Sequence, residues 1–282
     1  MGKLTTIDHS RDVAGLKYVY PVMSRRAGGL SIGINFNPNN ACNWRCVYCQ
    51  VPSLVRGGAP SIDYPLLEKE LVFFLDDVLN GSFYDRFEVP SENRQIKDIA
   101  ISGNGEPTSV EGFDEVISLI GETIEKAKIN DPYQFVLITN GSLIHKKQVR
   151  KGLAVLNQLQ GRVWFKLDSA THVGRKMINN AGGLQEKYVE NLQLSASLCP
   201  TWVQTCLLKI DGQILDVKEQ VAYLKLLEDV LEKVDLQGVL LYTLARPSMQ
   251  PEAKRLSKVS GQELNDFAAQ IRLLGLDVRV SE

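Results

Sequence analysis

The stretch Ser31–Cys49, SIGINFNPNNACNWRCVYC, joins a short strand-like segment to a cluster of cysteines. Its first part predicts a strand over 31–37, which a proline and several asparagines then break. Cys42, Cys46 and Cys49 follow, separated by three and by two residues. The thiols therefore come directly after a strand, and functional groups of parallel α/β proteins lie at the carboxyl ends of strands.

The rest of the chain alternates strand-like runs with amphipathic helical patterns. Six strands, each followed by a helix, imply parallel strands joined by right-handed crossovers. This suits an open doubly wound sheet or a partial barrel, because a complete barrel of about 250 residues leaves little room for an irregular N-terminal segment. We predict an α/β fold: an open six-unit (β/α)6 partial TIM barrel with a short N-terminal lead-in and a C-terminal helix. The expected strands are 31–37, 96–102, 134–139, 162–168, 202–209 and 238–244.

Four helical faces, with apolar residues three or four positions apart, accompany these strands. The last face follows a capping box over Ser260–Glu263. We expect an N-terminal extension packed on the core (1–30), a core domain (31–250) and a C-terminal helix and tail (251–282). The expected faces are Leu67, Leu71, Phe74, Leu75 and Val78; Phe113, Val116, Ile117, Ile120 and Ile124; Val217, Val221, Leu224, Leu227 and Leu231; and Leu264, Phe267, Ala268 and Ile271.

Composition and charge exclude several classes of protein. The 282 residues include 32 basic and 33 acidic ones, so the net charge of −1 does not favour a polyanionic partner. No apolar run suits a signal peptide or reaches the roughly 18 residues of a membrane span. Five unevenly placed cysteines argue against a disulfide framework and for metal binding in a reducing compartment. We therefore expect a cytoplasmic protein without membrane association.

Three thiolates on one loop can hold a soft metal centre. Structural zinc sites use separated ligand pairs and close the fourth position with Cys or His, and no histidine lies near this loop. Iron–sulfur electron carriers hold each cluster with four cysteines. Three ligands leave one metal position open, which is where a metal performs chemistry. The alternatives are plain buried cysteines, or a zinc- or cluster-binding module that serves assembly or electron transfer without catalysis.

The C-x3-C-x2-C spacing, with Tyr48 before the last cysteine, resembles the signature of the radical SAM superfamily. Gly103-Asn-Gly105-Glu106, after the second strand, resembles the Gly-Gly-Glu element of that family. Ser24-Arg25-Arg26 and Thr243-Leu-Ala-Arg246-Pro247 are similar to a branch related to wyosine-forming tRNA enzymes. The resemblance implies a 4Fe–4S cluster on the three cysteines, with S-adenosylmethionine on its open iron. One electron from an external donor then releases a 5′-deoxyadenosyl radical, which abstracts hydrogen from a substrate.

The resemblance also assigns roles to residues around this cluster. Tyr48 is expected to pack against the adenine of the cofactor, or to fill the loop as an ordinary aromatic. Gly103 and Gly105 allow positive φ and a close approach of the backbone to a ligand. A capping box over Thr108–Glu111 would satisfy the next helix, which leaves the Glu106 carboxylate for the methionyl amine.

Charged groups lie at the ends of later strands. Alternation along 162–168 places Lys166 and Asp168 on one interior face. Two opposite charges there must pair or bind something polar, so they suit the ribose hydroxyls and carboxylate of the cofactor. A structural ion pair is the alternative. Arg246 is a candidate for binding an anionic group of the cofactor or the substrate.

The remaining cysteines, Cys199 and Cys206, argue for a single cluster, because a second cluster needs more thiols. No motif selects a base, a sugar, a peptide or a small acid as the substrate. The branch resemblance suits an RNA nucleoside, whereas the single-cluster layout suits a glycyl-radical activase that acts on a partner protein.

Overall fold

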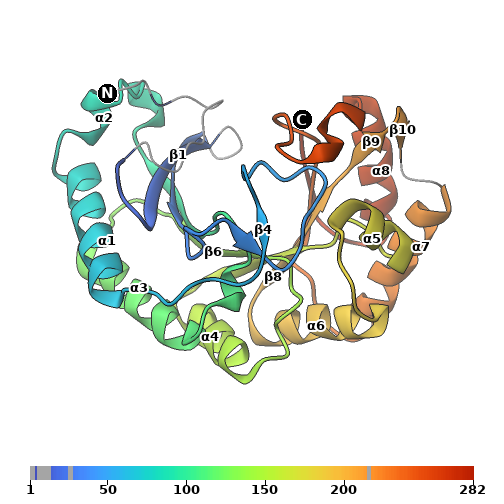
Figure 1. The fold of residues 1–282 in the computed structure, drawn as a ribbon, viewed down its shortest axis with the longest axis horizontal. Coiled ribbons are helices and arrows are strands. Elements are labelled where there is room, and N and C mark those ends of the chain that lie inside the picture. The colour runs from blue at the N-terminus through green and yellow to red at the C-terminus, as the bar shows by residue number, and fades with distance from the viewer. Residues whose placement is uncertain (1–3, 5–13, 25–27, 215–216) are drawn as a thin grey trace.

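The computed structural model describes residue 4 and residues 14–24, 28–214 and 217–282. Its central feature is an eight-stranded sheet curled into an open half-barrel, with helices on the outside (Figure 1). The strand order is β1-β2-β5-β6-β7-β8-β11-β13, and the predicted partial barrel is confirmed. The strands are β1 (Val19–Ser24), β2 (Gly29–Ile34), β5 (Ile96–Ile101), β6 (Gln134–Thr139), β7 (Arg162–Lys166), β8 (Thr201–Cys206), β11 (Gly238–Tyr242) and β13 (Val278–Ser281).

All six predicted strands are present and pair in parallel from β2 to β11. Five of them end earlier than predicted, among them β2 at Ile34 and β7 at Lys166. Beyond these two strand ends, side-chain oxygens accept hydrogen bonds from backbone amides. Asn35 Oδ1 accepts from the Asn37 amide, and Asp168 Oδ1 accepts from the Cys206 amide. The polar residues at these strand ends are therefore part of the loops that follow.

The predicted strand over 202–209 is wrong in its second half. The main sheet ends at Cys206, and the chain continues as β9 (Leu208–Ile210) in a separate three-stranded sheet with β10 (Gln213–Ile214) and β12 (Leu256–Lys258). No glycine, proline or other turn residue marks the change of sheet in this segment, so the sequence pattern could not separate the two strands.

Two edge strands escaped the sequence pattern. β1 pairs antiparallel with β2, and β13 pairs parallel with β11, so both terminal segments complete the main sheet. Pro21 lies in β1, where an edge position tolerates the missing amide hydrogen. Most of the expected N-terminal extension before residue 14, and the Arg25-Arg26 pair of the lead-in motif, lie outside the described residues.

The helices cover the outer face of the sheet (Figure 1). The expected apolar faces of α1, α3 and α8 are buried as predicted, and α8 begins with the expected capping box. In the described part of the chain, no helix is long and apolar enough to cross a membrane. The helices are α1 (Tyr64–Leu79), α2 (Phe83–Arg86), α3 (Phe113–Ala127), α4 (Lys147–Gln158), α5 (His172–Asn179), α6 (Gln185–Leu198), α7 (Val217–Leu231) and α8 (Gly261–Arg272); the 3-10 turns are η1 (Ser91–Asn93), η2 (Pro107–Ser109) and η3 (Pro251–Arg255).

The predicted face of α7 is wrong in its first two turns, although Leu227 farther along the helix is buried as predicted. Val217 and Val221 are 70% and 61% exposed, while Glu219 and Tyr223 point inward. The Glu219 carboxylate accepts hydrogen bonds from the hydroxyls of Ser169 and Thr171 and from the amides that follow β7. These polar anchors rotate the helix away from the face that apolar periodicity alone selects.

Candidate functional site

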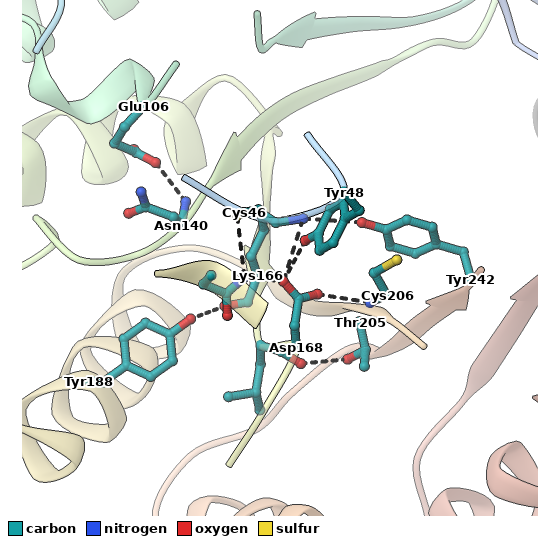
Figure 2. A network of polar contacts seen from close by, with 12 residues as sticks. Cys46, Tyr48, Glu106, Asn140, Lys166, Asp168, Tyr188, Thr205, Cys206 and Tyr242 are labelled. Atoms are coloured by element: carbon teal, nitrogen blue, oxygen red, sulfur yellow. Dashed lines mark hydrogen bonds and ion pairs between the residues drawn. The ribbon is translucent and has the colours of Figure 1, made fainter. Parts of the chain in front are cut away.

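One cavity of about 1150 Å³ opens inside the half-barrel and reaches the loops at the carboxyl ends of the strands. The residues predicted for the site come from four separate segments of the chain, and all but Asp168 line this cavity. Figure 2 shows Cys46, Tyr48, Glu106, Lys166 and Asp168 among them. Those that line the cavity are Cys42, Cys46, Tyr48, Cys49, Gly103, Gly105, Glu106, Lys166 and Arg246. The structure therefore gathers residues that lie up to about 200 positions apart in the sequence.

The cysteine loop begins as β3 (Ala41–Cys42), which pairs in parallel with β4 (Val55–Arg56). Its three thiols are partly buried and face the same cavity. The Cys42 sulfur accepts a hydrogen bond from the Trp44 amide at 3.4 Å, and the Cys46 sulfur accepts one from Asn179 Nδ2 at 3.3 Å. Donors aimed at sulfur stabilise the thiolate that a metal requires.

Burial has the opposite effect on these thiols. It raises the pKa of Cys42 to about 12 and that of Cys46 to about 11, and the nearby Glu106 and Asp168 carboxylates add to the two shifts respectively. A metal centre must therefore displace protons from this loop when it binds. Within the described residues, no three His, Cys, Asp or Glu side chains are close enough to hold a single metal ion. A cubane cluster instead presents its irons at separate corners, so its ligands need not meet at one point.

The glycine turn after β5 is pressed against the cysteine loop. A Cβ added at Gly103 would lie 2.1 Å from Asn35 Oδ1, and one added at Gly105 would lie 2.0 Å from the Ala41 carbonyl oxygen. Asn35 Oδ1 also accepts a hydrogen bond from the Asn104 amide at 3.0 Å. The glycines thus allow two protein segments to approach each other, which their predicted approach to a ligand did not anticipate.

Glu106 joins the end of β5 to the end of β6. Its Oε1 accepts from the Thr108 amide (3.1 Å), the Thr108 hydroxyl (2.5 Å) and the Thr139 hydroxyl (2.6 Å), and its Oε2 accepts from the Asn140 amide (2.6 Å). Burial raises the pKa of this carboxyl, although the four donors counteract that shift. The predicted Thr108–Glu111 capping box is wrong, because Thr108 bonds to Glu106 and α3 begins later, after Gly112.

Asp168 is held by protein donors on both oxygens. Oδ2 accepts from the Tyr48 hydroxyl (2.5 Å) and from Asn179 Nδ2 (2.7 Å), and Oδ1 accepts from the Cys206 amide (2.8 Å), as Figure 2 shows in part. It does not line the cavity. The Asp168 carboxylate therefore fixes the side chain of Tyr48, which belongs to the cysteine loop.

Lys166 is the cation of this network. Its Nζ lies 4.0 Å from Asp168 Oδ2 and 4.9 Å from the centre of the Tyr48 ring, and it donates to the Tyr242 hydroxyl at 3.1 Å. Burial disfavours the charged ammonium, but the Asp168 carboxylate and Tyr242 more than offset it, and the pKa lies well above its usual value. Lys166 therefore brings a positive charge to the cavity wall.

Two segments that the sequence did not mark hold the cysteine loop in place. The end of α5 accepts backbone bonds from Arg45 (to Asn179 O, 3.1 Å) and Val47 (to Ile178 O, 2.8 Å). After β11, the Ser248 hydroxyl donates to the Val47 carbonyl at 2.6 Å. The only sequence signal for Asn179 is its place in the loop region after the fourth predicted strand.

Arg246 lies at the cavity edge beside the cysteine loop. Its guanidinium donates to Gln50 Oε1 at 2.8 Å, one residue after Cys49. The Met249 amide donates to the Cys49 carbonyl at 2.9 Å, so the segment that carries Arg246 is tied to the loop. The structure thus places Arg246 beside the cysteine loop.

The chain matches no protein-family model. Over 135 residues it is 30% identical to a protein named GTPase Obg from Brachyspira hyodysenteriae, and over 233 residues it is 25% identical to a UPF0026 protein from Helicobacter pylori. These alignments cover 48% and 81% of the chain. The chain spans only 17% and 66% of the lengths of these two relatives.

Several solved structures share the fold. TYW1 with a bound lysine-pyruvate adduct superposes with a TM-score of 0.55 at 14% identity, over 86% of this chain and 73% of that one. A radical SAM methyltransferase from Sphaerobacter thermophilus superposes with a TM-score of 0.57 at 13% identity, over 95% of this chain and 70% of that one. Spore photoproduct lyase with bound AdoMet and a dinucleoside spore photoproduct superposes with a TM-score of 0.53 at 11% identity, over 88% of this chain and 75% of that one. The chain has the fold of the radical SAM enzymes, as the sequence resemblance implied.

Proposed function

We propose that the chain is a radical SAM enzyme, in which Cys42, Cys46 and Cys49 hold a 4Fe–4S cluster and S-adenosylmethionine binds beside them in the cavity. When bound, these groups supply reductive cleavage of S-adenosylmethionine to methionine and a 5′-deoxyadenosyl radical, which abstracts hydrogen from a substrate. The observation that carries the proposal is the meeting of the thiol loop, the glycine turn and Glu106 at one cavity.

The donor set fits such a cluster. Three thiols, and no fourth ligand on the same loop, leave one iron position for a further ligand. Trp44 and Asn179 direct hydrogen-bond donors at two of the sulfurs. Such bonds orient ligands and tune the reduction potential of a bound cluster.

Residues of the chain offer partners for the amine, the carboxylate and the adenine of S-adenosylmethionine. Glu106 Oε2 accepts one protein hydrogen bond where Oε1 accepts three, so Oε2 keeps acceptor capacity for the methionyl amine. The Lys166 ammonium suits the methionyl carboxylate. The ring of Tyr48 lines the cavity and offers a face for the adenine, while Asp168 acts on the cofactor through Tyr48 rather than by direct contact.

The cavity has room for a substrate beside the cofactor, because its volume exceeds the roughly 300–1,000 Å³ of common ligand pockets. Arg246 is proposed to bind an anionic group there. The two candidate substrate classes are an RNA nucleoside and a partner protein on which the enzyme forms a glycyl radical. An external one-electron donor completes the reaction.

Anaerobic reconstitution with iron and sulfide tests the proposal. The protein should bind about four irons, the content of one cubane. With dithionite it should convert S-adenosylmethionine to 5′-deoxyadenosine. Cys46→Ala should abolish both, whereas Cys199→Ala, a buried cysteine away from the cavity, should abolish neither.

If the cluster is reduced but no 5′-deoxyadenosine forms, the proposal is wrong and the chain is a non-catalytic cluster-binding module. Substantially more iron would contradict the single cluster. Comparison of RNA nucleosides and of partner-protein radicals, with and without the enzyme, then separates the two substrate classes.

A further inference from the structure

A second hollow, which we call the outer groove, lies behind the cysteine loop. It has a volume of about 350 Å³ and is lined by residues of α5 and of the segment formed by β9, η3 and β12. Val47 lies in its floor, whereas Cys46, Tyr48 and Cys49 line the cavity. The cysteine loop is therefore the wall between the groove and the candidate cluster site. The groove is lined by Val47, Val173, Lys176, Met177, Asn180, Ile210, Glu252, Arg255 and Leu256.

The groove exposes apolar side chains that a folded chain ordinarily covers. Val173 and Met177, on the outer face of α5, are 75% and 48% exposed. Ile210 and Leu256 line the opposite side and are only partly buried. A small apolar centre with charged residues around it is the anatomy of a protein–protein contact.

The charge around the groove is positive. Lys176 of α5 lines the groove, α5 carries no acidic residue, and Lys254 lies on η3 with Arg255. The two nearby acids already face arginines: Glu252 lies 2.8 Å from Arg45, and Asp211 lies 2.6 Å from Arg255. Lys176 and Lys254 therefore give this face an excess of positive charge, which favours an acidic partner.

We propose that the outer groove is the docking surface of an acidic one-electron carrier protein, which passes its electron to the cluster across the Val47 segment. This inference rests on the proposed function. The carrier is oxidised by one electron, the cluster is reduced by one, and no bond is made or broken. The rate of electron transfer falls steeply with distance, and the groove approaches the cysteine loop from the side that cofactor and substrate do not fill. Redox encounters use small interfaces steered by charge, which this surface provides.

The test uses an acidic flavodoxin in its hydroquinone state as the donor and follows loss of the cluster's visible absorption by stopped flow. Lys176→Glu and Lys254→Glu, on separate elements, should each slow reduction about tenfold at low salt. The difference should shrink near 1 M salt, where the screening length is only about 3 Å. Lys126→Glu, an exposed residue on α3 across the molecule in Figure 1, is the matched control and should change little.

Dithionite distinguishes failure of docking from failure of the site. Its small radical anion needs no docking surface, so all variants should be reduced by it within about twofold of wild type. The docking proposal is overturned if flavodoxin reduces the groove variants as fast as it reduces Lys126→Glu. It is also overturned if the groove variants are reduced by dithionite as much more slowly than wild type as they are by flavodoxin. A wild-type cluster that dithionite cannot reduce counts against the proposed function instead.

Binding supplies a readout that needs no cluster. Titration of iron-free protein with oxidised flavodoxin should give a Kd raised at least roughly fivefold by Lys176→Glu and unchanged by Lys126→Glu. Equal affinities would overturn the proposal even if no cluster forms. If instead the wild type is a dimer that Met177→Glu dissociates, the groove is an interface between copies of this chain and the proposal is wrong.

Discussion

Removing the Glu106 carboxylate should destabilise the whole protein, and not only weaken a cofactor contact. The side chain is 2% exposed and accepts four hydrogen bonds, and the hydroxyl-bearing partners Thr108 and Thr139 are at most 1% exposed. The carboxylate therefore stabilises the junction of β5, η2 and β6 before any ligand binds.

Two substitutions give different magnitudes. Glu106→Gln can keep the three bonds to Oε1, but its amide nitrogen would face the Asn140 amide, so one charge-assisted bond becomes a donor–donor contact. We expect a loss of about 2–3 kcal/mol in the free energy of unfolding. Glu106→Ala leaves four buried donors without an acceptor, and we expect a loss of about 4 kcal/mol or more.

Urea unfolding of the iron-free protein, followed by circular dichroism, measures both losses. Glu122→Gln, at an exposed position on α3, is the matched control and should stay within about 0.5 kcal/mol of wild type. A Glu106→Ala protein as stable as wild type would refute the reasoning. If Glu106→Gln folds, its affinity for S-adenosylmethionine then tests the proposed contact of Oε2 with the amine.

Three further predictions each concern one residue. Asn179→Leu removes the donor to the Cys46 sulfur (3.3 Å), so the midpoint potential of the reconstituted cluster should become more negative; an unchanged potential in spectroelectrochemistry would remove Asn179 from the site. Gly105→Ala places a Cβ 2.0 Å from the Ala41 carbonyl oxygen and should cost about 1–3 kcal/mol of unfolding free energy and reduce iron uptake, whereas Gly182→Ala, with no atom within 4 Å, should do neither. The Lys209 ammonium and the Ser260 capping bonds lower the pKa of Glu263 from 4.5 to about 2, so this carboxylate stabilises the fold above pH 4.5 and loses that effect as the pH falls toward 2. The unfolding temperature of Glu263→Gln should therefore be lower than that of wild type at neutral pH, and the two should converge in acid. A difference in unfolding temperature that stays the same at every pH would contradict this.

Local patterns in the sequence were enough for the elements of the barrel. The period of the apolar residues identified six parallel strands and the buried faces of α1, α3 and α8, because burial on one side leaves a periodic trace. The same signal failed for the first two turns of α7, where Glu219 points inward and bonds to the loop after β7. It also missed β1 and β13, because an edge strand needs little apolar alternation.

The site divides in the same way. The sequence by itself determined which residue types stand at the strand ends: three thiols, two glycines, a carboxylate and a lysine, since each follows a recognisable strand. Only the tertiary structure decided what each one contacts. Asn179 reaches Cys46 across 133 positions, and Tyr48 reaches Asp168 across 120. Such bonds depend on how distant loops pack together at one end of the sheet, and that packing leaves no periodic pattern in the chain.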